Sequence, residues 1–189
     1  MGNVKRNWTV LFIGGASGTG KSTLAYQLAD YYRVNVQEAD DIAQALKAST
    51  PKDIFPVIHS GADWREIGVE KNVHWLINVG REMIPALRAV AERHIDDKLP
   101  VIIEGDFICP EFVFSFKNPE IKSFFVIESD ENQIVKNYLE REGGKAQNYR
   151  AEISIAHSEW IKNECIEKGI NYIESRPQEN LLGRALNIL

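Results

Sequence analysis

The sequence predicts an α/β protein with a five-stranded parallel sheet between two layers of helices. Two observations predict this fold. Short apolar runs without polar alternation recur along the 189-residue chain, as in strands covered on both faces. Stretches with apolar residues at helical spacing separate them, which is the order of βαβ units. With 44% hydrophobic and 26% charged residues, the composition is that of a globular protein, and we expect one domain over residues 1–189.

The apolar runs give the expected strands, and the helical patterns lie between and after them. The strands are expected at residues 9–13, 34–36, 101–103, 123–127 and 170–173. Helical spacing of apolar residues is found in residues 24–32, 73–91, 134–139 and 153–168, and again from residue 179. Because these stretches alternate with the runs, each is expected to cover a face of the sheet.

A long insertion, residues 42–98, separates the second expected strand from the third. Its second half carries a clear helical stripe of apolar residues. Pro85 falls inside this stripe and predicts a kink, because proline removes a backbone donor and crowds the preceding turn. Residues 49–68 are rich in turn formers and are expected to form a loop or short helices.

A glycine-rich motif follows the first expected strand and opens the first expected helix. Residues 15–22 satisfy G-x-x-x-x-G-K-[ST], the pattern of a phosphate cradle. Glycines let the backbone approach phosphate oxygens, and the amides and helix dipole attract their charge. Lys21 is expected to reach the β- and γ-phosphates of ATP, and Ser22 to coordinate Mg²⁺. The nucleotide-binding residues of this loop are predicted to be Gly15, Ala16, Ser17, Gly18, Thr19, Gly20, Lys21, Ser22 and Thr23. The alternative, a glycine turn of a dinucleotide fold, has no use for the Lys-Ser pair.

Other classes of protein are disfavoured by composition and by missing motifs. A net charge of −5 argues against a broad nucleic-acid or membrane surface. No apolar run is long enough for a transmembrane helix, and residues 1–10 lack the apolar core of a signal peptide, so we expect a cytoplasmic protein. The guanine-reading N-K-x-D and the D-x-x-G switch of regulatory GTPases are absent. The third strand ends in Glu104-Gly105 rather than in the Asp-Glu of motor ATPases.

Two sequence blocks, GGASGTGKSTLA and VIIEGDFICP, carry a resemblance to a known group. With an acidic pair after the second strand, a long insertion, a lid with arginines and a late Arg-Pro, the chain resembles P-loop kinases of the nucleoside-monophosphate-kinase-like superfamily. The two blocks are similar to those of small-molecule kinases of the 2-phosphoglycerate kinase-like or AAA-type ATP-binding kind. The resemblance implies a three-layer P-loop fold with strand order 2-3-1-4-5, and ATP with Mg²⁺ as cofactors.

Four acidic residues follow the second and third strands, at the edge where open α/β sheets bind ligands. Asp40 and Asp41 follow the second strand, and the resemblance implies that an acid there orients or deprotonates the acceptor. We favour Asp40, although an aspartate at this point is also suited to cap the next helix. Glu104 ends the third strand and is predicted to serve Mg²⁺ or to align the acceptor. Asp106 shares that rim as a candidate acceptor contact, and both could also be charges where the chain meets solvent.

Basic residues in two loops, and the neighbouring Trp64 and Arg65 of the insertion, complete the predicted site. The segment 141–152 combines Gly143-Gly144 with flanking cations and is predicted to be a lid, with Arg141 as the catalytic cation by resemblance. A solvated charged linker is the alternative. The resemblance places Arg176-Pro177 against the adenine, although a rigid turn before a helix explains it equally well. Trp64 can stack on the acceptor or lie in the core, and Arg65 is predicted to bind an anionic acceptor.

These observations predict an ATP-dependent kinase of a small molecule, with Lys21, Asp40, Glu104 and Arg141 as catalytic residues. Ser22 and Glu104 would serve the metal. The expected partners are ATP and a small-molecule acceptor, in a monomer or homodimer, with no nucleic acid or membrane. The alternatives are an ATP-binding regulatory module that hydrolyses ATP slowly, and a kinase of a larger acceptor, as in toxin-like P-loop kinases. The four histidines show no metal-ligand spacing and are predicted to be structural.

Overall fold

The computed structural model of the protein describes residues 6–60 and 64–189, and it contains a five-stranded sheet. The strands run in the order β2-β3-β1-β4-β5, and every pairing is parallel. This confirms the predicted sheet and its order. The strand bounds are Val10–Gly14 (β1), Asn35–Glu38 (β2), Val101–Gly105 (β3), Ile121–Ile127 (β4) and Tyr172–Glu174 (β5).

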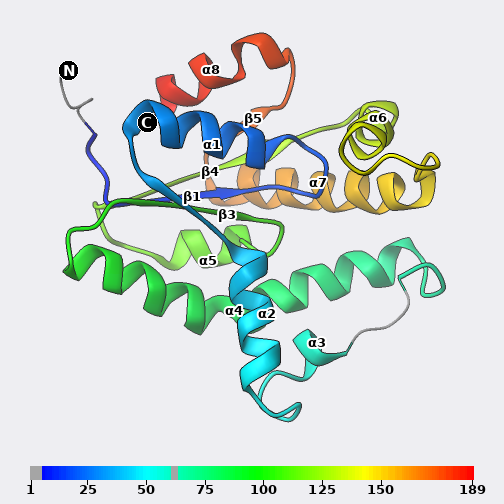
Figure 1. The fold of residues 1–189 in the computed structure, drawn as a ribbon, viewed down its shortest axis with the longest axis horizontal. Coiled ribbons are helices and arrows are strands. Elements are labelled where there is room, and N and C mark those ends of the chain that lie inside the picture. Colours follow the sequence, from blue (N-terminus) through cyan, green and yellow to red (C-terminus); the bar gives the residue numbers. More distant parts are fainter. Residues whose placement is uncertain (1–5, 61–63) are drawn as a thin grey trace.

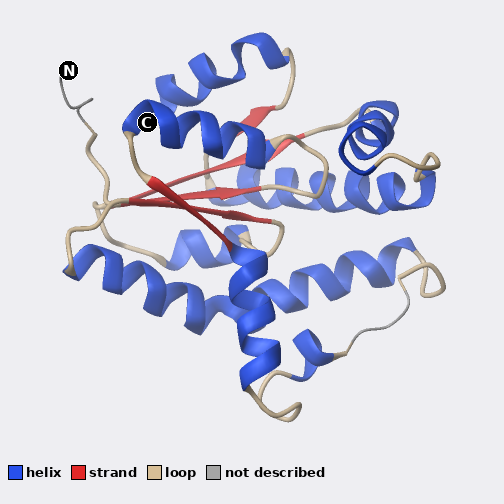
Figure 2. Cartoon of the chain, in the orientation of Figure 1, coloured by secondary structure: helices blue, strands red, loops and turns tan. Residues whose placement is uncertain are grey.

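Helices cover both faces of the sheet (Figures 1 and 2). Alternate residues of β1 point to opposite faces, as strand geometry requires. Leu11 and Ile13 pack with α1 (Lys21–Tyr32) and α8 (Leu181–Ile188), whereas Val10 and Phe12 pack with α4 (Val69–Asp96), α5 (Pro110–Ser115) and α7 (Asn148–Lys168). All five residues of β1 are buried, which explains why the strand shows no polar alternation in the sequence.

The carboxyl ends of the three strands that precede the expected site lie level with one another. Gly14 of β1 is in register with Gly105 of β3, and Glu104 is in register with Glu38 at the end of β2. Parallel strands deliver their following loops to the same edge of a sheet. The glycine loop, the segment after β3 and the start of α2 (Ala39–Ser49) therefore meet at this edge.

The insertion forms α2, the short helix α3 (Pro56–His59) and the long helix α4. The apolar stripe predicted for α4 is buried against the sheet, with Met83, Leu87 and Ala91 fully covered. The helix continues through Pro85, and Figure 1 shows α4 bending near its middle, in agreement with the kink expected there. None of the helices in the described part of the chain is both long and apolar enough to cross a bilayer.

The predicted lid, residues 141–152, comprises the end of α6 (Glu131–Glu142), the connection after it and the start of α7. Asp130 caps the start of α6, because its side chain accepts hydrogen bonds from the backbone amides of Asn132 and Gln133. Gly143 and Gly144 both have positive φ, and a Cβ atom at either position would have no neighbour within 4 Å. This segment turns the chain through open space, as a mobile connection requires. The 3₁₀ turn η1 (Gln178–Asn180) joins β5 to α8.

Gly80, in the middle of α4, permits close packing of this helix on the segment after β3. A Cβ atom at Gly80 would lie 2.7 Å from the backbone oxygen of Phe107, so one of the two backbones must move to accept it. We expect Gly80→Ala to lower the free energy of unfolding in urea by about 1–3 kcal/mol. Gly183→Ala in α8 is the matched control, because its Cβ meets nothing within 4 Å and helix propensity favours alanine by up to about 1 kcal/mol. Equal stabilities for the two variants would contradict this packing argument.

Candidate active site

The glycine loop wraps from the end of β1 to the start of α1 and is held in place by neighbouring elements. Gly15 has φ +150°, and a Cβ atom there would lie 2.5 Å from the backbone oxygen of Val126. Glycine is therefore the residue that lets the loop cross so close to β4. The side-chain amide of Asn137, on α6, donates a 2.7 Å hydrogen bond to the backbone oxygen of Gly18. The loop is thus tied to the helix that leads into the predicted lid.

Lys21, the first residue of α1, is buried among acidic groups. It is 7% exposed and forms an ion pair with Asp106, which follows β3. Burial opposes its charge, but the attraction of Asp106 and Glu104 outweighs that effect, and the pKa of Lys21 lies above its ordinary value. The ammonium group therefore stays charged at the point where the glycine loop meets the segment after β3.

Glu104 and Ser22 form a candidate metal site beside this ion pair. Glu104 is 3% exposed, and burial raises its pKa, while Lys21 and a hydrogen bond from the Ser22 hydroxyl oppose the rise. Its Oε2 atom is buried and has no hydrogen-bond partner in the described part of the chain. A carboxylate oxygen without a partner next to a hydroxyl is a donor set that suits Mg²⁺, which takes few protein ligands and completes its shell with water and phosphate oxygens.

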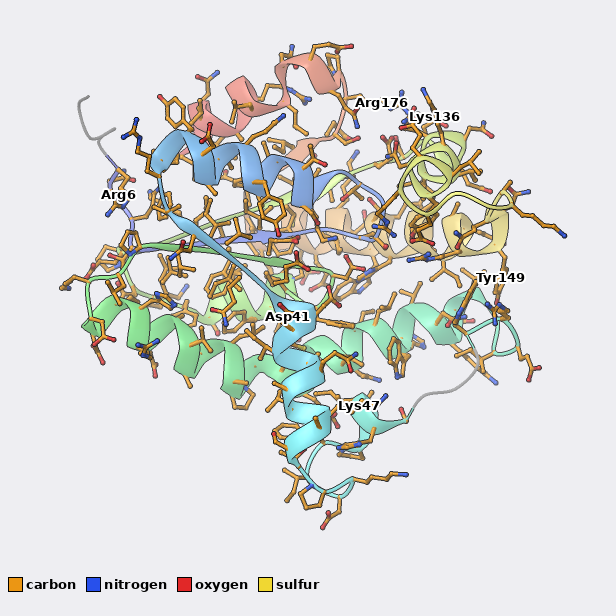
Figure 3. All side chains as sticks on the ribbon, in the orientation of Figure 1. Arg6, Asp41, Lys47, Lys136, Tyr149 and Arg176 are labelled. Atoms are coloured by element: carbon orange, nitrogen blue, oxygen red, sulfur yellow. The ribbon has the colours of Figure 1, made fainter. Side chains whose placement is uncertain are left out.

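Asp40 and Asp41 lie in the first turn of α2, and the helix begins after Glu38, so neither aspartate occupies the capping position. Removal of water by the surrounding protein, together with the negative charge of Asp106, raises the pKa of Asp40 to about 6, although Lys21 opposes the shift. Asp40 is nevertheless exposed to solvent on one side of the site. Figure 3 shows Asp41 at the top of α2, where the helix leaves the sheet. The positive charge of Lys21 therefore acts directly on the carboxylate of Asp40.

A cleft of about 680 Å³ opens next to Lys21, between the glycine loop, α4 and α7. Asp106 and Ser17 are among its lining residues, so the cleft reaches the ion pair of Lys21. The remaining lining residues come from the insertion, α6, the predicted lid and α7: Trp64, Arg65, Asn72, Trp75, Leu76, Tyr138, Glu142, Gly143, Lys145, Gln147, Arg150, Ile153, Ser154 and His157.

Aromatic side chains form the outer wall of the cleft. Trp64 stacks on Tyr149 with ring centroids 6.0 Å apart and an angle of 12° between the rings. Figure 3 shows Tyr149 at the start of α7, facing the N-terminal end of α4. The guanidinium of Arg65 lies 4.8 Å from the centre of the Trp64 ring and also borders the cleft. Trp64 therefore contributes to a wall, while residues 61–63 of the same segment lie outside the described residues.

Glu142 holds the basic residues of the predicted lid together. It accepts hydrogen bonds from Gln147 (2.8 Å), Arg141 (2.6 Å) and Arg150 (2.9 Å), and in that order these bonds lower its pKa to about 2. Arg150 also lies 4.2 Å from the centre of the Tyr138 ring. Arg150 borders the cleft, whereas Arg141 is not among the residues that line it.

Arg176 and Pro177 are not among the residues that line the cleft, and they precede a residue that lies beside the glycine loop. A Cβ atom at Gly20 would lie 3.7 Å from the side-chain nitrogen of Gln178, the next residue along the chain. Arg176 reaches Glu128 (3.1 Å) and Asp130 (3.4 Å), and Figure 3 shows it at the end of the molecule that carries α6. These ion pairs fix the loop after β5 beside the end of β4.

Ser154 and His157 border the cleft and were not found as site residues by sequence reasoning, whereas Arg150 lies in the segment predicted to be a lid. On α7, Arg150, Ser154 and His157 are spaced i, i+4 and i+7, so they share one face of the helix, and all three line the cleft. Ser154 is hydrogen bonded to the hydroxyl of Tyr138 at 2.7 Å. This spacing of polar residues inside an otherwise buried helix face was the available signal. It was missed because only the apolar positions of α7 were used to place the helix.

Comparisons with known proteins relate the chain to kinases. No protein-family model matches it. A 2-phosphoglycerate kinase from Methanococcus vannielii is 28% identical over 120 residues, which cover 57% of this chain and 38% of that protein. A 2-phosphoglycerate kinase from Pyrococcus horikoshii is 29% identical over 120 residues, which cover 55% of this chain and 37% of that protein. The matches thus span less than half the length of these relatives.

Solved structures share the fold along nearly the whole chain. A gluconokinase from Sinorhizobium meliloti has a TM-score of 0.54 at 14% identity, and the match covers 97% of this chain and 92% of that one. A shikimate kinase from Acinetobacter baumannii, in complex with shikimate, has a TM-score of 0.53 at 13% identity and covers 95% and 92%. Together with the sheet order and the glycine loop after β1, these neighbours show that the chain has the α/β P-loop fold that these kinases share.

Proposed function

We propose that the protein transfers the γ-phosphoryl group of ATP to a small anionic acceptor, with 2-phosphoglycerate as the first candidate. One observation carries the proposal: Lys21 of the phosphate cradle is paired with Asp106, and Asp106 lines the cleft. A phosphate bound in the cradle and a molecule in the cleft would therefore meet at this ion pair. The relatives named 2-phosphoglycerate kinase support the choice of the first acceptor.

The nucleotide would be held by the glycine loop. Its backbone amides and the N-terminus of α1 supply positive electrostatic potential, and Lys21 supplies a charge for the β- and γ-phosphates. Ser22 and the unpartnered oxygen of Glu104 would hold Mg²⁺, whose chemistry is to neutralise charge on the phosphate oxygens. In this proposal Arg176 and Pro177 border the adenine, because their loop lies beside Gly20.

The acceptor would lie in the cleft with its anionic group toward the predicted lid. Arg65, Lys145 and Arg150 line the cleft from the insertion, the predicted lid and α7, whereas Asp106 lines it from the segment after β3. This separation of charge favours a molecule with a phosphate or carboxylate at one end and a hydroxyl at the other. The hydroxyl would face Asp106, which lines the cleft; Asp40 does not line it but feels the charges of Asp106 and Lys21, and it is the second candidate to orient the hydroxyl or accept its proton. 2-Phosphoglycerate has both kinds of group.

Acceptor-stimulated release of ADP tests this function. Purified protein with ATP and Mg²⁺ is offered 2-phosphoglycerate, gluconate, shikimate, glycerate and a nucleoside in separate reactions, with Lys21→Ala as the inactive control. We expect 2-phosphoglycerate to raise turnover above the acceptor-free rate, and a new phosphate ester to appear in the ³¹P spectrum. ADP release at one constant rate with every acceptor would indicate a slow ATPase and would contradict the proposed kinase.

Arg150 provides a prediction about the acceptor. Arg150→Gln is expected to raise the KM of an anionic acceptor about tenfold, because a charge-assisted hydrogen bond to an anion contributes about 1.5–3 kcal/mol. The KM of ATP should change far less. Arg141→Gln is the matched control, since Arg141 also bonds to Glu142 but is not among the cleft residues. Equal effects of the two substitutions on acceptor KM would argue that the lid rearranges and that Arg150 has no special place in it.

A further inference from the structure

His157 is a buried polar residue in the wall of the cleft, and one of its ring nitrogens has no hydrogen-bond partner in the described part of the chain. The side chain is 2% exposed and lines the cleft, one helical turn beyond Ser154. Its Nδ1 atom is buried, and no hydrogen-bond partner for that atom is found in residues 6–60 and 64–189. A buried polar atom without a partner lowers the stability of the fold, because it loses its hydrogen bonds to water on folding and gains none from the protein.

The neighbours of His157 fix its ring and its charge. The imidazole stacks on Trp160, with ring centroids 5.9 Å apart and an angle of 17° between the rings. Burial lowers the pKa of His157 to about 4; Asp106 opposes this shift and Lys21 adds to it. The ring is therefore neutral near pH 7, with one nitrogen able to donate a hydrogen bond and the other able to accept one.

Other buried polar groups on the same helix are satisfied. The Ser154 hydroxyl bonds to Tyr138, and the Ser158 hydroxyl accepts a 3.0 Å bond from the backbone amide of Glu128. These serines join α7 to α6 and to the end of β4, which is a structural role. His157 makes no such connection, and it faces the space that the proposed acceptor would fill.

We propose that His157 is a contact residue for the acceptor, and that its imidazole forms a hydrogen bond with an uncharged group, such as a hydroxyl, at the Asp106 end of the cleft. This inference rests on the proposed function and specifies how the acceptor is oriented in the cleft. An anionic group of the acceptor is disfavoured at this end, because the nucleotide phosphates held by Lys21 would repel it, whereas Arg65, Lys145 and Arg150 line the cleft from the insertion, the predicted lid and α7. His157 would therefore select acceptors that carry a hydroxyl on the side opposite their anion.

The test compares three variants of the protein in the assay of acceptor-stimulated ADP release, with 2-phosphoglycerate as the acceptor. His157→Phe keeps a ring that can stack on Trp160 but removes both nitrogens, and we expect it to raise acceptor KM about three- to tenfold, the size of one hydrogen bond. Its melting temperature should equal or exceed that of the wild type, because a buried atom without a partner is removed. His157→Asn returns a donor and an acceptor and is expected to recover part of the loss in KM.

Ser158→Ala is the matched control, because it removes a buried hydroxyl from the next position of α7 without touching the cleft. It should lower the melting temperature and leave acceptor KM unchanged. An unchanged acceptor KM in His157→Phe, with normal turnover, would overturn the inference and leave the proposed function intact. Absence of acceptor-dependent turnover in the wild type would overturn the proposed function, and the inference with it.

Discussion

Replacement of Lys21 with alanine is expected to lower kcat for phosphoryl transfer by at least about a hundred- to a thousandfold, the loss that follows removal of one donor to a developing charge. Lys21 is buried, stays charged and lies at the junction of the glycine loop and the cleft. The charge on the transferring group is spread over its oxygens in the transition state, and a fixed ammonium group stabilises it without reorganisation. Acceptor-dependent release of ADP at saturating ATP measures this effect.

Lys21→Ala is also expected to weaken the fold, and this must be separated from catalysis. Removal of one member of a buried ion pair costs about 3–5 kcal/mol, because the charge that remains is uncompensated. Here Asp106 would remain, next to the buried Glu104. The double variant Lys21→Ala, Asp106→Asn should regain stability in urea while staying inactive. A double variant no more stable than Lys21→Ala would contradict this account of the ion pair.

Lys136 is a matched control for the charge itself. It lies on α6, is exposed, and pairs with Glu140 at 3.7 Å; Figure 3 shows it pointing away from the sheet. Exposed ion pairs contribute about 0–1 kcal/mol, so Lys136→Ala should leave stability and turnover nearly unchanged. Wild-type turnover by Lys21→Ala, under conditions where Lys136→Ala is also active, would exclude the glycine loop as the catalytic phosphate site.

The sheet and the phosphate cradle could be predicted because each has a strong local signal. β1 is buried on both faces, so its sequence is continuously apolar, and the motif of residues 15–22 requires glycine at places where the backbone passes close to β4. The helix α5 was not predicted. It has only six residues, too few to display a helical period, and it lies under the sheet as part of the packing that follows β3.

The cleft was harder to predict because its residues come together only in the folded chain. Asp106 was a minor candidate in the sequence, yet it is the acid that pairs with Lys21 and lines the cleft. The resemblance favoured Arg141, but the sequence has no local signal that separates it from Arg150, since both lie in the predicted lid and both bond to Glu142. Which of the two arginines borders the cleft depends on where α7 begins and on how its first turn packs on Tyr138. That contact joins two helices, so it cannot be predicted from the local sequence.

Replacement of Asp40 with asparagine is expected to lower kcat by about a hundred- to ten-thousandfold, the range for loss of a general base. Asp41→Asn is the matched control, because it removes the same charge from the same helical turn. The pKa of Asp40 is raised to about 6, chiefly because protein displaces water around it, so the carboxylate is charged at pH 7 but is a stronger base than an ordinary aspartate. Turnover should therefore rise with pH through about 6 in the wild type.

The raised pKa of Asp40 also makes a prediction about stability, with the opposite sign. The folded protein binds the Asp40 proton more tightly than the unfolded chain does. The free energy of unfolding of the wild type therefore falls as pH rises from about 4 to about 6, and above that pH Asp40 causes no further loss. Asp40→Asn lacks this loss and should become more stable than the wild type over that interval, as measured by urea denaturation at a series of pH values. A variant that gains stability in this way and loses turnover would show that the carboxylate is retained for catalysis. If Asp40→Asn keeps full turnover while Asp106→Asn loses it, Asp106 is the residue that accepts the acceptor's proton. In that case the nucleotide phosphates would replace Asp106 as the partner of Lys21, and the Asp106 carboxylate would become available to the acceptor.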